Sequence, residues 1–96
     1  MEIKEFQNVI RAIYRDRDAA RGTDKTYLWL LEEVGELTRV YRRGESEKIG
    51  GEMADVIAWL ASLANLLQID LEAELLKKYP RHCLLCRSVP CQCPPA

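Results

Sequence analysis

The chain has 96 residues, of which 48% are hydrophobic and 30% charged, and these values indicate one globular domain and exclude a disordered chain. Its 14 basic and 15 acidic residues give a net charge of −1 and are dispersed, so no basic surface indicates nucleic acid as a partner. The N-terminus is charged and amphipathic, unlike a signal peptide, and no apolar run approaches the roughly 20 residues of a membrane span. We therefore expect a cytoplasmic protein with no membrane partner.

The first half of the chain predicts two long helices. Apolar residues at three- and four-residue spacing predict a helix over 2–20, with Gly22 as its stop. The next helix is predicted over about 24–43, with Thr23 or Asp24 as its N-cap.

The second half predicts another long helix, a short one and a cysteine-rich tail. Gly44 separates the second helix from a third, which has Ser46 as its expected N-cap and runs to about residue 68. Asp70 caps a short fourth helix over 71–79, which ends before Pro80. No alternating pattern indicates a strand. The predicted fold is all-α, an antiparallel bundle of three long helices plus a short fourth, followed by a Cys-rich knuckle.

Four acidic residues are placed symmetrically about Gly44. Glu36 and Glu52 lie eight residues on either side of it, and Glu33 and Asp55 lie eleven. If the chain folds back at this glycine, the four carboxylates converge between two antiparallel helices. Like charges at close range are costly unless a cation neutralises them. Oxygen-only ligands suit a hard divalent cation, Mg²⁺ or Mn²⁺.

Glu33 and Glu52 also fall within the apolar faces of their helices, where an acid without a partner is costly. The alternative is a solvated face with ordinary ion pairs. Possible basic partners for such pairs are Arg39, Arg42, Arg43 and Lys48. We prefer the metal site, because solvated acids would avoid the apolar face.

The segment Glu32-Glu33-x-x-Glu36, followed after fifteen residues by Glu52-x-x-Asp55, resembles the signature of MazG-like nucleotide pyrophosphohydrolases of the all-α NTP pyrophosphatase superfamily. The likeness covers about residues 24–79, and we place the catalytic domain at 1–79. It implies Mg²⁺-dependent hydrolysis of a nucleoside triphosphate to the monophosphate and pyrophosphate, for house-cleaning or control of nucleotide pools.

The resemblance also implies roles for the individual acids. By position the metal ligands would be Glu33, Glu36, Glu52 and Asp55. Glu32 would lie in the outer shell and orient or deprotonate the attacking water, so Glu32 and Glu33 are the candidate catalytic carboxylates.

Substrate contacts are assigned to basic and aromatic residues. Lys77 matches a basic position in the family's fourth helix and is the first candidate for a phosphate contact, followed by Lys48 and Arg43 near the turn. The alternative for Lys77 is an ordinary surface lysine. Trp29 and Trp59 are also symmetric about the turn and could stack a nucleobase, although they could instead fill the core or a subunit interface.

The tail over 80–96 holds four cysteines as Cys83-x-x-Cys86 and Cys91-x-Cys93. Four thiolates within eleven residues predict a structural Zn²⁺ knuckle with no open position for water. Disulfides are the alternative in an oxidising setting. His82 is expected to be a bystander or a replacement ligand.

Two other functions compete with the first. Phosphoribosyl-ATP pyrophosphatase is the runner-up within the superfamily, although its usual sequence lacks a cysteine knuckle. A different class is a non-catalytic zinc-knuckle interaction protein whose bundle only dimerises. Two departures from the family pattern concern substrate contacts, since Ser62 stands where members often carry Asn and the fourth helix ends early at Pro80.

The wide apolar faces predict a homodimer or homotetramer with the active site near a subunit contact.

Overall fold

The computed structural model describes residues 1–95, and Ala96, the last residue of the predicted tail, lies outside the described residues. Its helices are α1 (Ile3–Arg21), α2 (Thr23–Arg42), α3 (Ser46–Leu66) and α4 (Leu71–Lys78). No strand occurs within residues 1–95. The predicted all-α fold with three long helices and a short fourth is therefore confirmed, with helix ends within two residues of the predicted ones.

The helix ends are set by glycine and by one side-chain cap. Gly22 adopts φ +86°, which ends α1, because a residue with a Cβ rarely takes this conformation. The prediction that Thr23 or Asp24 caps α2 is wrong: Gly22 is the N-cap, without a side-chain hydrogen bond, and Thr23 is already helical. Asp70 caps α4 as predicted, since its carboxylate accepts a hydrogen bond from the Ala73 N–H at 3.1 Å.

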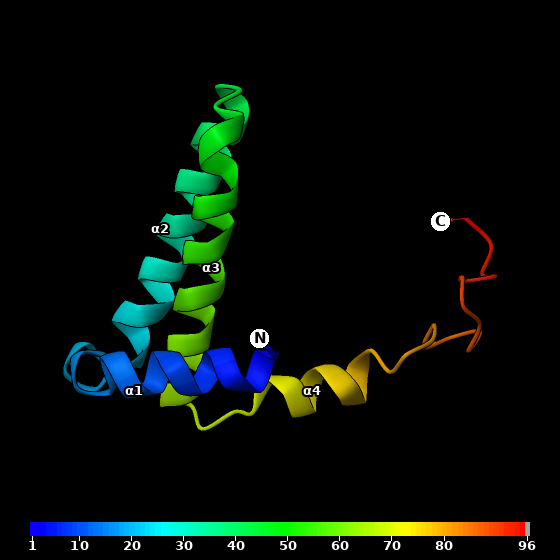
Figure 1. Ribbon diagram of the computed structural model, residues 1–96, viewed down its shortest axis with the longest axis horizontal. Helices are drawn as coiled ribbons and strands as arrows, with labels where there is room; N and C mark the ends of the chain where they lie inside the picture. Colours follow the sequence, from blue (N-terminus) through cyan, green and yellow to red (C-terminus); the bar gives the residue numbers. More distant parts are fainter. Residues whose placement is uncertain (96) are drawn as a thin grey trace.

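Helices α2 and α3 form an antiparallel hairpin that turns at Gly44 (Figure 1). Gly44 has φ +69°, and its N–H donates to the Tyr41 carbonyl at 3.1 Å. Ser46 is the first residue of α3 and not its N-cap, a position taken by Glu45. The sharp reversal brings α3 back along α2, which is the arrangement that the symmetric acids require.

Helix α1 lies across the base of this hairpin, and α4 leaves the base as an arm that points away from it (Figure 1). The arm contacts the N-terminal end of α1, where the Lys4 N–H donates to Glu72 at 3.3 Å and the Lys4 ammonium lies 3.7 Å from Asp70. The cysteine tail continues from the arm and lies far from the hairpin in Figure 1. The two cysteine pairs and the acidic helices therefore occupy separate parts of the molecule.

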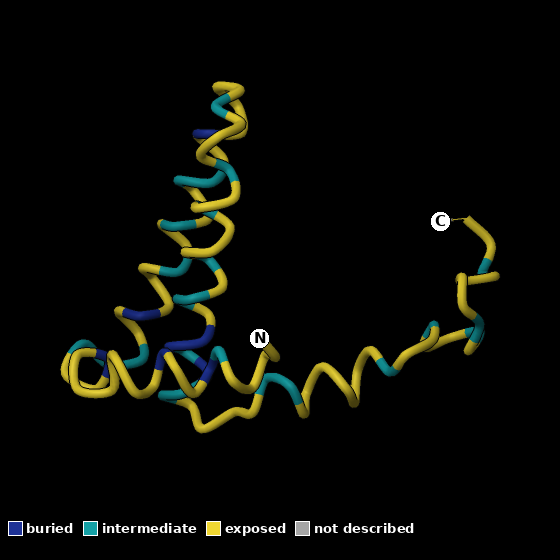
Figure 2. The backbone as a smooth tube through the Cα atoms, in the orientation of Figure 1, coloured by how far each residue is buried: buried dark blue, intermediate teal, exposed yellow. Residues whose placement is uncertain are grey.

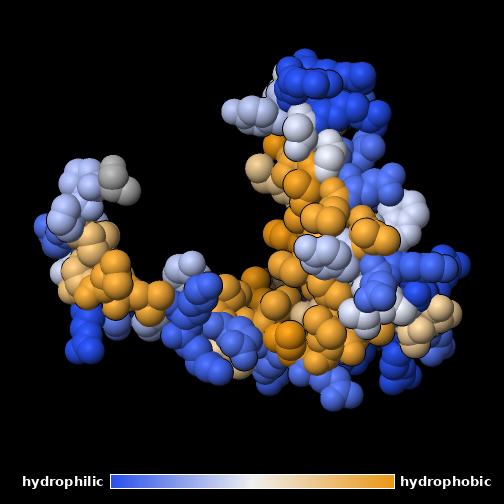
Figure 3. All heavy atoms as spheres, turned by 180° about the vertical axis from the view of Figure 1, so that it is seen from behind, coloured by the Kyte–Doolittle hydropathy of each residue, from blue (hydrophilic) through white to orange (hydrophobic). Residues whose placement is uncertain are grey.

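Burial is concentrated where α1 meets the hairpin, and most of the hairpin's length is exposed or half-buried (Figure 2). The buried hydrophobic residues are Ile10, Val40, Ala61 and Ala64. Large apolar side chains gather along the hairpin and over its base (Figure 3). Those more than two-fifths exposed on the hairpin are Tyr27, Leu28, Trp29, Leu31, Val34, Tyr41, Met53, Ile57 and Leu60. One chain therefore leaves a large apolar surface on α2 and α3 uncovered.

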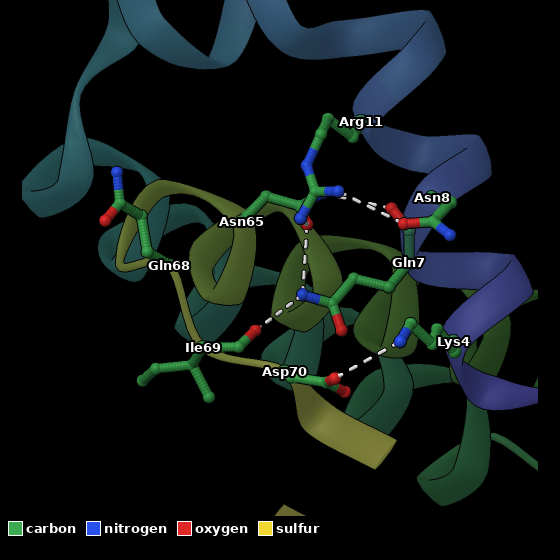
Figure 4. Close-up of a pocket in the computed structure, with 8 residues that line it drawn as sticks. All are labelled: Lys4, Gln7, Asn8, Arg11, Asn65, Gln68, Ile69 and Asp70. Atoms are coloured by element: carbon green, nitrogen blue, oxygen red, sulfur yellow. Dashed lines mark hydrogen bonds and ion pairs between the residues drawn. The ribbon is translucent and has the colours of Figure 1, made fainter. Parts of the chain in front are cut away.

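Polar contacts join α1 to the turn that precedes α4 (Figure 4). The Gln7 side chain is 3% exposed and donates to the Asn65 side chain at 3.0 Å and to the Ile69 carbonyl at 2.6 Å. Its Oε1 accepts from the Leu71 N–H at 3.0 Å. The residues that form these bonds lie at a surface pocket of about 410 Å³. The bonds pair the amide groups of Gln7 and join α1 to the turn before α4, so this pocket has a structural explanation.

Within residues 1–95, no single helix is both long and apolar enough to cross a membrane. Helices α3 and α4 meet that description only as a pair, and they are bent by 102° relative to each other.

Candidate active site

The hairpin brings three of the four predicted acids together. Carboxylate oxygens of Glu33 on α2 and of Glu52 and Asp55 on α3 lie within 4.8 Å of one another. Glu33 and Glu52 are half-buried, and Asp55 is exposed. The three residues form what we call the acidic cluster, which borders solvent on the side of Asp55.

Glu36, the fourth predicted ligand, is not part of this group. Its carboxylate forms an ion pair with Arg39, one turn later on α2. This is one of the ordinary ion pairs considered as the alternative from the sequence. Its predicted role as a metal ligand requires a different rotamer and stays a prediction.

Crowding of negative charge is evident at Glu33. Burial raises the pKa of Glu33, and the charges of Asp55, Glu52 and Glu36 raise it further. A bound cation would reverse these charge effects, because it favours the ionised form of every acid around it. The cluster therefore has the charge and the ligand atoms of a site for a hard cation.

Glu32 lies beside the acidic cluster on the solvent side of α2. It lines a small surface depression of about 100 Å³ together with Lys25, Leu28 and Trp29. Its charge is among those that raise the pKa of Glu33. Its role as an outer-shell residue stays a prediction.

A pocket of about 310 Å³ adjoins the acidic cluster through Asp55. It lies between α1 and α3, which cross at the base of the hairpin. Its lining residues are Ile10, Tyr14, Arg17, Asp18, Arg21, Asp55, Ala58, Trp59 and Ser62. We call it the α1–α3 pocket. Two aromatic rings and two arginines line it beside the acidic cluster. This combination is typical of sites for phosphorylated aromatic ligands.

The family model of the MazG nucleotide pyrophosphohydrolase domain matches residues 21–83, more than half of the chain. The chain belongs to this family. No curated protein matches the sequence. Membership indicates nucleotide pyrophosphohydrolase activity and a nucleotide substrate, and the family is typically metal-dependent. The matched segment contains α2, α3 and α4 and thus the whole acidic cluster of this MazG domain.

The two tryptophans of the MazG domain lie level on the hairpin, as their symmetry about Gly44 predicted. The rings of Trp29 and Trp59 are stacked, with centroids 5.8 Å apart and planes inclined by 16°. The guanidinium carbon of Arg21 lies 4.6 Å from the Trp59 ring centroid. Trp59 lines the α1–α3 pocket, whereas Trp29 lies beside Glu32.

The basic residues predicted to contact phosphate lie away from this pocket. Lys77 is on the α4 arm, 3.6 Å from Glu74, and Lys48 is 3.7 Å from Glu45 beside the turn. Arg43 is the C-cap of α2 at the tip of the hairpin. Within one chain, none of the three lines the α1–α3 pocket.

The basic residues that do line the pocket were missed from the sequence. Arg17 and Arg21 stand near the C-terminal end of α1, where the sequence predicted only that a helix stops at Gly22. Arg21 is held by Asp18 and by the Thr26 hydroxyl, each 3.0 Å from its Nη1. Thr26 is fully buried and donates to the Gly22 carbonyl at 2.7 Å. The feature of the sequence that could have identified these two arginines is the cluster of charged residues at the end of an amphipathic helix.

The four cysteines of the tail form a second cluster. Their sulfurs lie within 4.8 Å of one another, with 3.8 Å between Cys83 and Cys93 and 4.0 Å between Cys86 and Cys91. Hydrogen bonds from the Gln92 and Ser88 backbones lower the pKa of Cys86 to about 6. Hydrogen bonds between the Cys93 thiol and neighbouring sulfurs, of which the one with Cys91 has the largest effect, raise the pKa of Cys93 to about 11. This cysteine cluster could hold a metal ion.

Proposed function

We propose that this MazG domain hydrolyses a nucleoside triphosphate to the monophosphate and pyrophosphate in a reaction that depends on Mg²⁺ or Mn²⁺. The observation that carries the proposal is the acidic cluster of Glu33, Glu52 and Asp55, whose oxygens lie within 4.8 Å of one another at the edge of the α1–α3 pocket. Glu36 lies one turn from Glu33 and could complete the ligand set by leaving Arg39.

The donor set of the acidic cluster fits a hard cation. Two oxygens bound to one Mg²⁺ are about 3 to 4 Å apart, and the oxygens of the cluster, all within 4.8 Å of one another, are near enough to reach one ion through small side-chain movements. When bound, the cation would neutralise phosphate charge, bind phosphate oxygens and lower the pKa of a coordinated water. The raised pKa of Glu33 supports this assignment, because an uncompensated acidic cluster is electrostatically unfavourable.

The chain's own residues supply the base and the positioning. Water attacks the α-phosphorus, the bond from this phosphorus to the oxygen that bridges to the β-phosphate breaks, and pyrophosphate leaves with that oxygen. Glu32 or Glu33 accepts the proton from the water, since no imidazole lies beside the cluster and the single His82 is in the tail. Arg17 and Arg21 are the basic residues placed to meet phosphate or sugar oxygens in the α1–α3 pocket.

We place the nucleoside in the α1–α3 pocket. Its volume of about 310 Å³ suits a nucleoside, and Trp59 and Tyr14 supply aromatic surface for a base. Trp29 does not line this pocket, so its proposed role is to position the Trp59 ring by stacking on it. The phosphate contacts predicted from the sequence require a second chain that brings its basic residues to the acidic cluster. These residues are Lys77, Lys48 and Arg43.

We propose that the cysteine cluster binds one structural Zn²⁺. Sulfurs at 2.3 Å from a tetrahedral Zn²⁺ are about 3.8 Å apart, which matches the 3.8 Å and 4.0 Å separations in the tail. A disulfide would need sulfurs about 2 Å apart. Backbone N–H groups of Gln92 and Cys93 lie 3.2 Å and 3.3 Å from Cys86 and Cys91 sulfurs, which stabilises thiolates. Four sulfur ligands leave no position for substrate.

We further propose a homodimer or homotetramer that uses the apolar surface of the hairpin. Exposed side chains such as Leu28, Leu31, Ile57 and Leu60 cover both helices, and a single chain leaves them in water (Figure 3). Light scattering coupled to gel filtration tests this proposal, and a species of 11.1 kDa at micromolar concentration would contradict it.

The decisive experiment for the activity is pyrophosphate release from a panel of NTPs and dNTPs in H₂¹⁸O with Mg²⁺. Attack at the α-phosphorus places ¹⁸O in the monophosphate, whereas attack at the β-phosphorus places it in pyrophosphate. We expect label in the monophosphate and loss of turnover in Asp55→Asn. Glu47→Gln, an exposed acid in the first turn of the same helix, is the matched control and should retain activity. Turnover that survives Asp55→Asn would exclude the proposed site.

A further inference from the structure

Asp18 is a buried acid with one oxygen that has no partner. The residue is 3% exposed, and its Oδ1 accepts from Arg21 Nη1 at 3.0 Å. Its Oδ2 is buried and has no hydrogen-bond partner among residues 1–95. A buried carboxylate oxygen without a hydrogen-bond donor lowers the stability of the folded chain, so its presence needs an explanation.

The place of Asp18 in the fold points to a ligand. It lines the α1–α3 pocket together with Trp59, the aromatic wall, and Asp55, a member of the acidic cluster. Nη1 of Arg21 donates to Oδ1 and to the Thr26 hydroxyl, so Oδ1 is already paired within the protein. Oδ2 is the one oxygen of this buried acid without a donor, and an N–H group of a ligand seated beside Asp18 in the pocket would supply one.

We infer that Asp18 selects the nucleobase by accepting a hydrogen bond from an exocyclic amino group. The pocket would then favour adenine and cytosine over hypoxanthine and uracil, which carry a carbonyl oxygen at the corresponding position. A carbonyl there would face the carboxylate without a proton between them, and both acceptors would stay unpaired. This inference rests on the proposed function, because it assumes that the α1–α3 pocket holds the nucleoside.

The competing role for Asp18 is purely structural, to hold Arg21 over Trp59. The two roles differ in what a change of Asp18 does to selectivity. A structural role predicts that all nucleotides lose activity by the same factor. Selection by Oδ2 predicts that the amino-to-carbonyl ratio itself changes.

The test compares two matched pairs, ATP with ITP and CTP with UTP, in wild type and Asp18→Asn. The asparagine keeps an oxygen for Arg21 and replaces Oδ2 with a donor. We expect wild type to prefer each amino base by about 10-fold or more in kcat/KM, and the variant to lose or invert that preference. Asp16→Asn, an exposed acid on the same helix, is the control and should keep the wild-type ratio. Equal kcat/KM within both wild-type pairs, or an unchanged ratio in a folded Asp18→Asn, would overturn the inference.

A second measurement avoids turnover altogether. Quenching of tryptophan fluorescence reports binding of AMP, IMP, CMP and UMP at the Trp59 wall, and wild type should bind each amino base more tightly. This arm decides the inference if circular dichroism shows that Asp18→Asn does not fold, and equal affinities within both pairs then overturn it. It also separates the two proposals. Selective binding without pyrophosphate release would contradict the proposed function but retain the base selection, whereas release without base preference would contradict only the base selection.

Discussion

The acidic cluster and the cysteine cluster both gather metal-ligand side chains, but the chain builds them in different ways. The acids come from two long helices and meet only because the hairpin turns at Gly44. The cysteines lie between 83 and 93, in a tail without helix or strand, and meet through local turns and N–H···S bonds. A cluster assembled across helices depends on the packing of the whole domain, whereas a local one does not.

The ligand atoms differ as well. Carboxylates at the edge of a pocket leave room for water and phosphate around a hard ion, whereas four sulfurs close the shell of a softer one. This difference supports the proposed catalysis at the hairpin and the proposed structural role of the tail. The following predictions test whether the two clusters are separate and how each depends on the rest of the domain.

The largest effect is expected from Asp55→Asn in the acidic cluster. Loss of a residue outside the ligand shell typically costs 10–100-fold in activity, so loss of a proposed ligand should cost more than about 100-fold in kcat/KM. Zinc content, measured by plasma emission spectroscopy, should not change. A variant with reduced zinc would show that the two clusters are coupled and would contradict their separation.

The converse change is Cys83→Ser in the cysteine cluster. We expect zinc to fall from one ion per chain to none, because the knuckle needs all four thiolates. Pyrophosphate release should stay within about 3-fold of wild type, since the tail lies far from the hairpin. A much larger loss of activity would indicate that the tail reaches an active site, either its own or that of a second chain.

The third prediction concerns the dependence on domain packing. Gln7→Ala removes the side-chain bonds that join α1 to Asn65, Ile69 and Leu71, and leaves buried polar groups without partners. The free energy of unfolding, measured with urea, should fall by about 1–3 kcal/mol. Zinc affinity should be unchanged, because no residue of the cysteine cluster takes part in these bonds. Asn8→Ala, at an exposed position beside Gln7, is the matched control and should cost much less.

The smallest effect is a pH dependence at Glu33. Its pKa is raised in the folded chain, so the folded state binds more protons than the unfolded state between the ordinary and the raised pKa. Stability of the magnesium-free protein should therefore fall as pH rises through the titration of Glu33, by an amount that solvent screening keeps small. Added Mg²⁺ should reverse the loss, and Glu33→Gln should abolish this dependence in thermal melts at several pH values. A melting curve that responds to pH in the same way in the variant would contradict the assignment to Glu33.

Much of the hairpin could be predicted from the sequence. Helical spacing and Gly44 determined two antiparallel helices, and residues symmetric about that glycine had to lie level, as the stacked Trp29 and Trp59 show. The family resemblance is confirmed by the match to the MazG domain. The spacing of the cysteines likewise required only local chain geometry to bring the four sulfurs together.

Only the tertiary structure decided which side chains surround the site. Periodicity along α1 identifies its apolar face but not the angle at which it crosses the hairpin, so Asp18 and Arg21 could not be placed beside Asp55 from the sequence. The rotamer of Glu36, which turns to Arg39, is likewise set by local competition between charges. Spacing within one helix is determined by covalent geometry, whereas contacts between helices depend on how their side chains pack, and the sequence alone does not state that packing.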